Sequence, residues 1–303
     1  MRRLLPRLMA PAPAGMHARP DRANRLPPRR GLAALGVVAV LAGATTFACA
    51  PAPIARVEPG AGLPAHDLRL AEPGPLPVQI DSGELRSAYG CEVRFELHRP
   101  SPEGDRGAMT VMLAHGFMRD LRSVRGWAEH LASHGVATVV VSFCNSTPFQ
   151  GRHARNAEDL RAVAAAIAPG DAPVVYAGFS AGGLAAYLAA AADPRAVAYL
   201  GLDAVDSAGL AASVASLALP ASFFAAEPSR CNAEGNMLPL ALALPAGRVV
   251  LIAHATHCDF ENPTSALCER LCGRVEPPEA AEAIRRAIRA LATDWALRHA
   301  HGR

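Results

Sequence analysis

The sequence predicts an α/β fold with a mostly parallel central sheet. Short apolar stretches rich in Val and Ala alternate along the chain with longer segments that repeat apolar positions at helical spacing. Alternating strands and helices of this kind form parallel sheets that are covered by helices. Hydrophobic residues make up 51% of the 303 positions, which is enough to bury one large core. Polar residues follow several of the apolar stretches, so we expect them to meet at the carboxyl edge of the sheet.

The expected elements run from residue 91 to residue 298. Residues 91–98 alternate polar and apolar side chains, the period of a half-exposed edge strand. The other expected strands are 108–114, 136–143, 174–179, 196–202, 221–226 and 248–253. The expected helices are 123–133, 156–167 with Asn156 as its cap, a helix after residue 183 that stops at Asp193, and 278–298.

The strongest chemical signal is Gly178-Phe179-Ser180-Ala181-Gly182, which stands between an expected strand and an expected helix. A serine at the tip of such a tight turn projects beyond the sheet edge, and the flanking glycines let the backbones pass closely. We therefore predict that Ser180 is a nucleophile. The backbone amide of Ala181 and the start of the helix point to the same place and favour negative charge there.

A second signal is His115-Gly116-Phe117, at the end of the expected strand 108–114. In serine hydrolases, the amide that follows such a His-Gly pair lies across from the amide that follows the nucleophile. We therefore predict that the backbone amides of Phe117 and Ala181 form an oxyanion hole. The imidazole of His115 is interpreted as structural and is expected to hydrogen-bond its own loop.

A serine nucleophile requires a base, and the base requires an acid that orients it. His257 is the predicted base, because it follows the last expected strand on a loop of small residues, whereas His254 is interpreted as structural. The acid is Glu227 or Asp203. Glu227 is preferred because it follows the strand before the histidine strand; Asp203 follows the strand one earlier and is the alternative.

The first 49 residues have the composition of a signal peptide. They contain eight Arg and one Asp, all before an apolar run that covers 31–48, and Cys49 follows this run. Cys49 is a candidate for lipidation, which would tether the protein to a membrane; ordinary secretion and a retained anchor are the alternatives. We expect an exported protein, whether periplasmic, secreted or lipid-anchored. Residues 50–77, rich in Pro and Ala, are expected to be a linker, and 78–303 a single domain.

The remaining cysteines suit an oxidising compartment. Six are left once Cys49 is set aside, and they predict three disulfides of undetermined pairing: Cys91, Cys144, Cys231, Cys258, Cys268 and Cys272. An alternative is a zinc site built from His257 and the last three cysteines, although their spacing fits no standard zinc pattern. The preferred interpretation therefore includes no metal and no organic cofactor.

The charge distribution argues against a nucleic-acid partner. Residues 50–303 carry 22 Arg against 26 acidic residues, so the net positive charge of the chain belongs to the leader. A nucleic-acid-binding domain would carry a basic face on its folded part.

Taken together, residues 90–275 resemble the α/β-hydrolase superfamily, and within it the chlorophyllase-like branch, a neighbour of dienelactone hydrolases and platelet-activating-factor acetylhydrolases. The resemblance is carried by His115-Gly116-Phe117, by 178–183, by Gly201-Leu202-Asp203-Ala204-Val205-Asp206 and by a histidine followed by paired late cysteines. It implies an α/β-hydrolase fold, ester cleavage and a role for Asp203 as the acid. Plant members carry His or Arg around the nucleophile where this chain has Phe179 and Ala181, so a chlorophyll substrate does not carry over.

The sequence thus predicts an exported serine carboxyl-ester hydrolase that acts on a small-molecule ester. Phe117, Met118, Phe149 and Phe179 near the expected pocket favour a substrate with an apolar portion, although core packing explains the same residues. One alternative is an acyltransferase or lipase with the same machinery. Another is a non-catalytic lipoprotein that binds a lipid or pigment.

Overall fold

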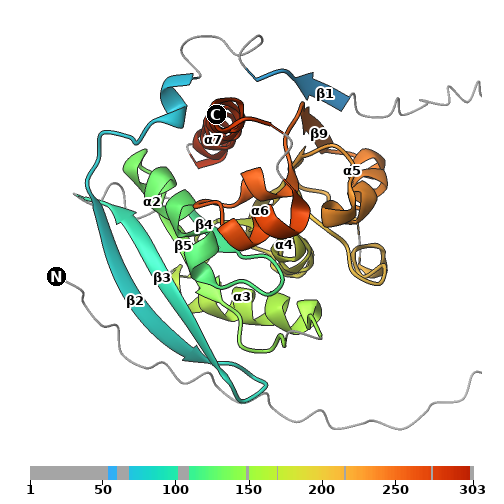
Figure 1. Cartoon of the computed structure of the whole chain (residues 1–303). Coiled ribbons are helices and arrows are strands. Elements are labelled where there is room, and N and C mark those ends of the chain that lie inside the picture. The colour runs from blue at the N-terminus through green and yellow to red at the C-terminus, as the bar shows by residue number, and fades with distance from the viewer. Residues whose placement is uncertain are drawn as a thin grey trace, which may run out of the picture. The chain divides into compact units, whose positions relative to one another are not determined.

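The computed structural model describes residues 54–59, 68–101, 109–147, 150–168, 170–214, 216–273 and 276–300. Within these ranges, nine strands form one sheet in the spatial order β1-β9-β8-β7-β6-β4-β5-β3-β2 (Figure 1). The strands are β1 (Ile54–Val57), β2 (Val78–Arg86), β3 (Glu92–Pro100), β4 (Thr110–Ala114), β5 (Thr138–Ser142), β6 (Val174–Phe179), β7 (Ala196–Leu202), β8 (Ala221–Ala225) and β9 (Gly247–Ile252). The predicted leader and Cys49 lie outside the described residues.

The sheet is mostly parallel, as the sequence predicted. The seven neighbouring strands β1, β9, β8, β7, β6, β4 and β5 pair with one another in parallel. Strand β3 is antiparallel to both of its neighbours, β5 and β2. The carboxyl ends of β4, β6, β7, β8 and β9 therefore lie at one edge. The loops that carry the candidate site residues all leave from this edge.

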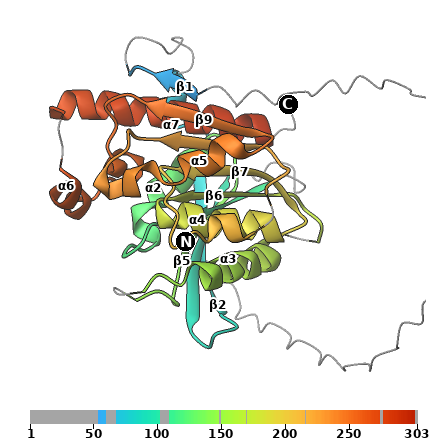
Figure 2. The same ribbon diagram turned by 90° about the vertical axis from the view of Figure 1, so that its right-hand side faces the viewer.

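Helices cover both faces of the sheet. Side chains of α3 (His153–Ile167), α4 (Ala181–Ala192) and α5 (Leu238–Ala243) pack in one apolar cluster, and those of α2 (Arg125–Ser133) and α7 (Pro278–Ala300) in the other. Figure 1 shows α2 and α7 on one side of the sheet and α3 and α4 on the other, and Figure 2 shows α7 running along its face. Strand β6 alternates between the clusters: Val174 and Tyr176 join the first, Val175 and Ala177 the second. This two-residue alternation is what a strand buried on both faces requires.

Two edge strands differ from the sequence-based expectation. Residues 78–86 form β2, which pairs with β3 along its whole length, so β3 is an inner strand rather than an edge strand. Strand β1 lies within 50–77, the expected linker, yet pairs in parallel with β9, and Ala253 N donates to Val57 O at 2.9 Å. Later in the same stretch, the short helix η1 (Arg69–Ala71) accepts a hydrogen bond from Arg289 Nε of α7 at 3.2 Å. Part of the expected linker therefore belongs to the folded domain.

The three predicted disulfides are confirmed, with the pairs Cys91–Cys144, Cys231–Cys272 and Cys258–Cys268. Such bonds persist in oxidising compartments and are rare in the cytosol. The disulfides thus suggest that the protein functions in an oxidising environment. Among the helices that the structure describes, none has the length and apolar character needed to cross a membrane.

Candidate active site

Ser180 occupies a strained turn between β6 and α4. Its φ of 55° and ψ of −128° lie in a region that non-glycine residues rarely adopt. The turn needs its two flanking glycines: a Cβ at Gly178 would come within 2.3 Å of Gly182 O, and one at Gly182 within 2.3 Å of His115 O. The backbones of strand, helix and neighbouring loop are therefore in direct contact around Ser180, as the motif predicted.

Backbone hydrogen bonds hold this strained residue in place. Ser180 N donates to Leu202 O at 3.1 Å, and Ser180 O accepts from Gly183 N at 2.9 Å and from Val205 N at 3.1 Å. These bonds join the turn to the end of β7 and to its own helix. The position of the Ser180 hydroxyl is thus set by three segments of backbone and not by one flexible loop.

His257 approaches Ser180 from the segment after β9. It is the first residue of the short helix η5 (His257–Phe260), and its Nε2 lies 2.9 Å from Ser180 Oγ. The carboxylate of Asp259 caps this helix by accepting from Thr256 N at 2.9 Å and from Thr256 Oγ1 at 2.8 Å. The Phe179 ring packs on the imidazole, with 4.7 Å between ring centroids. The buried ring is therefore fixed in position and orientation.

Asp203 completes the hydrogen-bonded chain. It follows β7 directly, has a φ of 45° and is 2% exposed, and its Oδ2 lies 2.6 Å from His257 Nδ1. Its other oxygen, Oδ1, accepts from Ala226 N at 3.0 Å and from Asn232 Nδ2 at 3.2 Å. A buried carboxylate is costly unless it is hydrogen-bonded, and here both oxygens have partners. Ser180, His257 and Asp203 thus form one continuous chain of hydrogen bonds.

Glu227, the preferred acid in the sequence analysis, lies elsewhere. Its side chain is 50% exposed and pairs with Arg56 of β1 at 2.8 Å. The residue before it, Ala226, is the one whose amide binds Asp203. The preference for Glu227 over Asp203 is therefore corrected: the structure places Asp203, the alternative, beside His257.

Asn232 is a buried residue of this site that the sequence analysis did not find. It lies in the short helix η4 (Arg230–Gly235) and is 1% exposed. Its Nδ2 donates to Asp203 Oδ1 and, at 3.0 Å, to Glu227 O, while its Oδ1 accepts from Ser229 N at 2.8 Å. Asn232 therefore holds the carboxylate of Asp203 through the loop after β8. The adjacent Cys231 was the only sequence signal near it.

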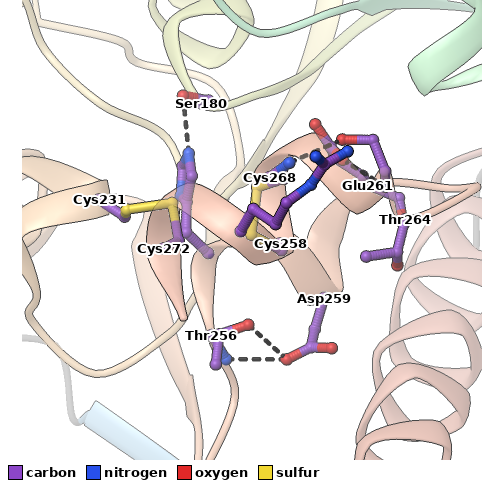
Figure 3. The surroundings of a disulfide bond; sticks show 12 residues. Ser180, Cys231, Thr256, Cys258, Asp259, Glu261, Thr264, Cys268 and Cys272 are labelled. Carbon is purple, nitrogen blue, oxygen red and sulfur yellow. Dashed lines mark hydrogen bonds between the residues drawn. A yellow bond between two sulfur atoms is a disulfide. The ribbon is translucent and has the colours of Figure 1, made fainter. Parts of the chain in front are cut away.

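Two disulfides brace the segments that carry Asn232 and His257. Cys231 and Cys258 are the neighbours of these residues, and their partners, Cys272 and Cys268, both lie in α6 (Ala266–Cys272) (Figure 3). The sulfur atoms of Cys258, Cys268 and Cys272 lie within 4.8 Å of one another. These are the cysteines of the alternative zinc site, but a sulfur bonded in a disulfide offers no thiolate to a metal.

The loop after β4 passes directly beside Ser180. A Cβ at Gly116 would lie 3.2 Å from Ser180 Cβ. His115 fixes the loop, because its Nδ1 lies 2.7 Å from Gly116 O and its Nε2 accepts from Phe143 N at 3.2 Å. Burial lowers the pKa of His115 to about 4, so the ring is neutral and matches its interpretation as a structural residue.

A pocket of about 210 Å³ opens at this loop, and Gly116, Phe117 and Ala181 contribute to its wall. Within the described residues, neither Phe117 N nor Ala181 N donates to a protein acceptor. The two residues whose amides are predicted to form the oxyanion hole therefore line the same cavity, and one of them directly follows Ser180. Phe117 and Met118 are exposed by 37% and 61%, Phe179 is buried under His257, and Phe149 lies outside the described residues.

No protein-family model matches the chain, and no similar protein is found among curated proteins.

Proposed function

We propose that the protein is a serine hydrolase of the α/β-hydrolase fold that cleaves carboxylic esters. The observation that carries the proposal is the hydrogen-bonded chain from Ser180 through His257 to Asp203, with its serine on a strained strand-to-helix turn. The three residues follow the order nucleophile, acid and histidine along the chain, which is the order in α/β-hydrolases. Their placement at the carboxyl ends of parallel strands also suits that fold.

The reaction would begin with proton transfer from Ser180 to His257. As Oγ of Ser180 attacks the carbonyl carbon, its proton passes to Nε2 of His257, and the carboxylate of Asp203 stabilises the resulting imidazolium. The carbonyl oxygen becomes an oxyanion, to which the amides of Phe117 and Ala181 donate. The ester C–O bond then breaks, and the leaving alkoxide takes the proton from Nε2.

The acyl group would leave by the reverse sequence. His257 removes a proton from water, the hydroxide attacks the acyl carbon, and the second tetrahedral intermediate is held by the same amides. Cleavage of the bond to Oγ releases the carboxylic acid, and Nε2 returns the proton to Ser180. Every step uses only the side chains of Ser180, His257 and Asp203 and the backbone amides of Phe117 and Ala181.

Export to an oxidising compartment belongs to the same proposal. The leader with its apolar run, 31–48, and the three disulfides both support it. Lipidation of Cys49 would tether the enzyme to a membrane.

Hydrolysis of p-nitrophenyl esters from acetate to palmitate tests the proposal. The full chain should release p-nitrophenol, and Ser180→Ala and His257→Ala should each lower kcat by at least about 10³-fold, because residues of one triad act as a unit. Ser213→Ala, which changes an exposed serine of the helix η3 (Ala211–Ser213), is the matched control and should keep the parent rate. A folded Ser180→Ala protein with the parent rate would refute the proposal. A disulfide-intact parent that hydrolyses no ester would favour a binding function.

A further inference from the structure

The pocket beside Ser180 has a polar wall that the ester-cleaving machinery does not use. His153 is the first residue of α3 and Asn156 lies three residues later, so the two side chains stand on the same face of its first turn. Both line the cavity together with Phe117 and Ala181. Since the proposed oxyanion hole lies in the same wall, a substrate held there would extend toward this turn of α3.

Asn156 presents an unsatisfied polar group. It is 3% exposed, and its Nδ2 donates to Ser146 Oγ at 2.9 Å. Its Oδ1 is buried and has no hydrogen-bond partner among the described residues. A hydroxyl of a ligand in the cavity that reaches this oxygen, on a small turn of the Asn156 side chain, would gain a hydrogen bond that the protein itself leaves unmade.

His153 adds a second polar group. It is 6% exposed, and no hydrogen bond joins its ring nitrogens to another residue in the described part of the chain. Burial lowers its pKa, an effect that the nearby Asp206 opposes in part, so the imidazole is neutral at pH 7. A neutral imidazole offers one donor and one acceptor. The Phe117 ring stands edge-on to it, with 6.4 Å between centroids, and fixes its position on the apolar side.

Among the described residues that line the cavity, the one cationic side chain is paired with an acid. This is Arg119, whose Nε donates to Glu261 Oε1 at 2.6 Å. The Glu261 residue is itself 2% exposed and so neutralises the guanidinium at close range. Phe117, Met118 and Phe143 supply the apolar part of the wall. An uncharged group with one polar point and a short hydrocarbon part matches this lining.

We propose that this pocket binds a hydroxyl group of the substrate through His153 and Asn156, which makes short hydroxyl-bearing esters the preferred class. The inference rests on the proposed ester hydrolysis and extends it to specificity. A hydroxyl both donates and accepts, so it pairs with a carboxamide and a neutral imidazole at once. The volume of about 210 Å³ lies below the roughly 300–1,000 Å³ of pockets that hold drug-sized ligands, which favours a short group over a long chain.

The test compares ethyl 3-hydroxybutanoate with ethyl butanoate, two esters that differ in one hydroxyl. The full chain should cleave the hydroxylated ester with a kcat/KM about tenfold higher or more, as two hydrogen bonds predict. His153→Phe and Asn156→Leu, each similar in size to the parent side chain, should each reduce this ratio by about fivefold. His254→Phe, at an exposed histidine outside the pocket, should keep the parent ratio.

The possible outcomes separate this inference from the function on which it rests. Equal or slower cleavage of the hydroxylated ester by the parent, with butanoate still cleaved, would overturn the hydroxyl site and leave ester hydrolysis standing. The hydroxyl site would also be overturned if folded His153→Phe and Asn156→Leu proteins preferred the hydroxylated ester as strongly as the parent does. Hydrolysis of neither ester, nor of the p-nitrophenyl series, would remove both proposals. Because the parent ratio needs no variant, the inference stays testable even if a substitution prevents folding.

Discussion

Asp203 and Glu227 follow neighbouring strands at the same sheet edge, yet their surroundings differ. Asp203 is buried and is met by three donors: His257 Nδ1, Ala226 N and Asn232 Nδ2. Glu227 is half exposed and faces Arg56. Sequence position alone did not separate them, because the choice depends on side-chain direction. The positive φ of Asp203, 45°, and the amide of Asn232 are features of the folded chain that no local sequence pattern encodes.

At the residue scale, Asp203→Asn should reduce kcat for ester hydrolysis by about 10⁴-fold, because an amide no longer holds His257 in the required tautomer. Glu227→Gln is the matched control. It should retain activity within about twofold, since an exposed ion pair contributes little. Steady-state kinetics on p-nitrophenyl butyrate checks both variants. The opposite pattern, with Glu227→Gln inactive and Asp203→Asn active, would reverse the assignment.

The strand-turn-helix element around Ser180 was predictable because its signal is local. The motif, the apolar strand before it and the Ala-rich helix after it lie within residues 174–192. The outer strands were harder to predict. Strand β1 has only four residues, and its role depends on pairing with β9, in which Ile54 lies opposite Val249, almost 200 residues later in the chain. Tertiary pairing of this kind leaves little trace in a short sequence window.

At the element scale, Gly182→Ala should separate α4 from the loop after β4. The new Cβ would lie 2.3 Å from His115 O and 2.5 Å from Ala114 O. Both are backbone atoms, so a change of side-chain rotamer cannot relieve the clash. We expect a loss of stability of about 1–3 kcal/mol and a decrease of about 10²-fold in kcat as the oxyanion loop moves.

The matched control for this substitution is Gly170→Ala. No atom lies within 4 Å of a Cβ there, and the cost is limited to the strain of its φ of 55°, about 1–2 kcal/mol. It should therefore lower the free energy of unfolding, measured by urea denaturation, and leave kcat unchanged. Parent activity in Gly182→Ala would show that the close contact is not needed for the site.

At the scale of the whole molecule, the sequence predicted the α/β class, the presence of three disulfides and the edge of the sheet at which the polar residues meet. The sequence did not predict most of the hydrogen bonds of the buried polar side chains. The bond of His115 to its own loop, at Gly116 O, was expected, but its bond to Phe143 N was not. Nor was the burial of His130, whose Nε2 lies 2.9 Å from Leu70 O. A histidine in a sequence does not reveal whether the fold will surround it with apolar groups.

These two histidines predict a stability that depends on pH. Burial lowers the pKa of each from 6.5 to about 4. Between these values the unfolded chain binds protons that the folded protein does not, so the free energy of unfolding should fall as pH drops from 6.5 to 4. Each histidine contributes a loss of up to about 3 kcal/mol. Urea denaturation across this range measures the slope, and His130→Gln, which retains a donor for Leu70 O, should make it shallower. An unchanged slope would contradict the assignment of the lowered pKa to His130.

The central claim is that Ser180 is an activated nucleophile, and covalent labelling with a fluorophosphonate tests it most directly. The full, disulfide-bonded chain should take up one label, and peptide mass spectrometry should locate it on Ser180. Ser180→Ala should take up none, and His257→Ala should react far more slowly, because the base that removes the Oγ proton is gone. A folded parent protein that remains unlabelled, or one labelled at a different residue, would contradict the account.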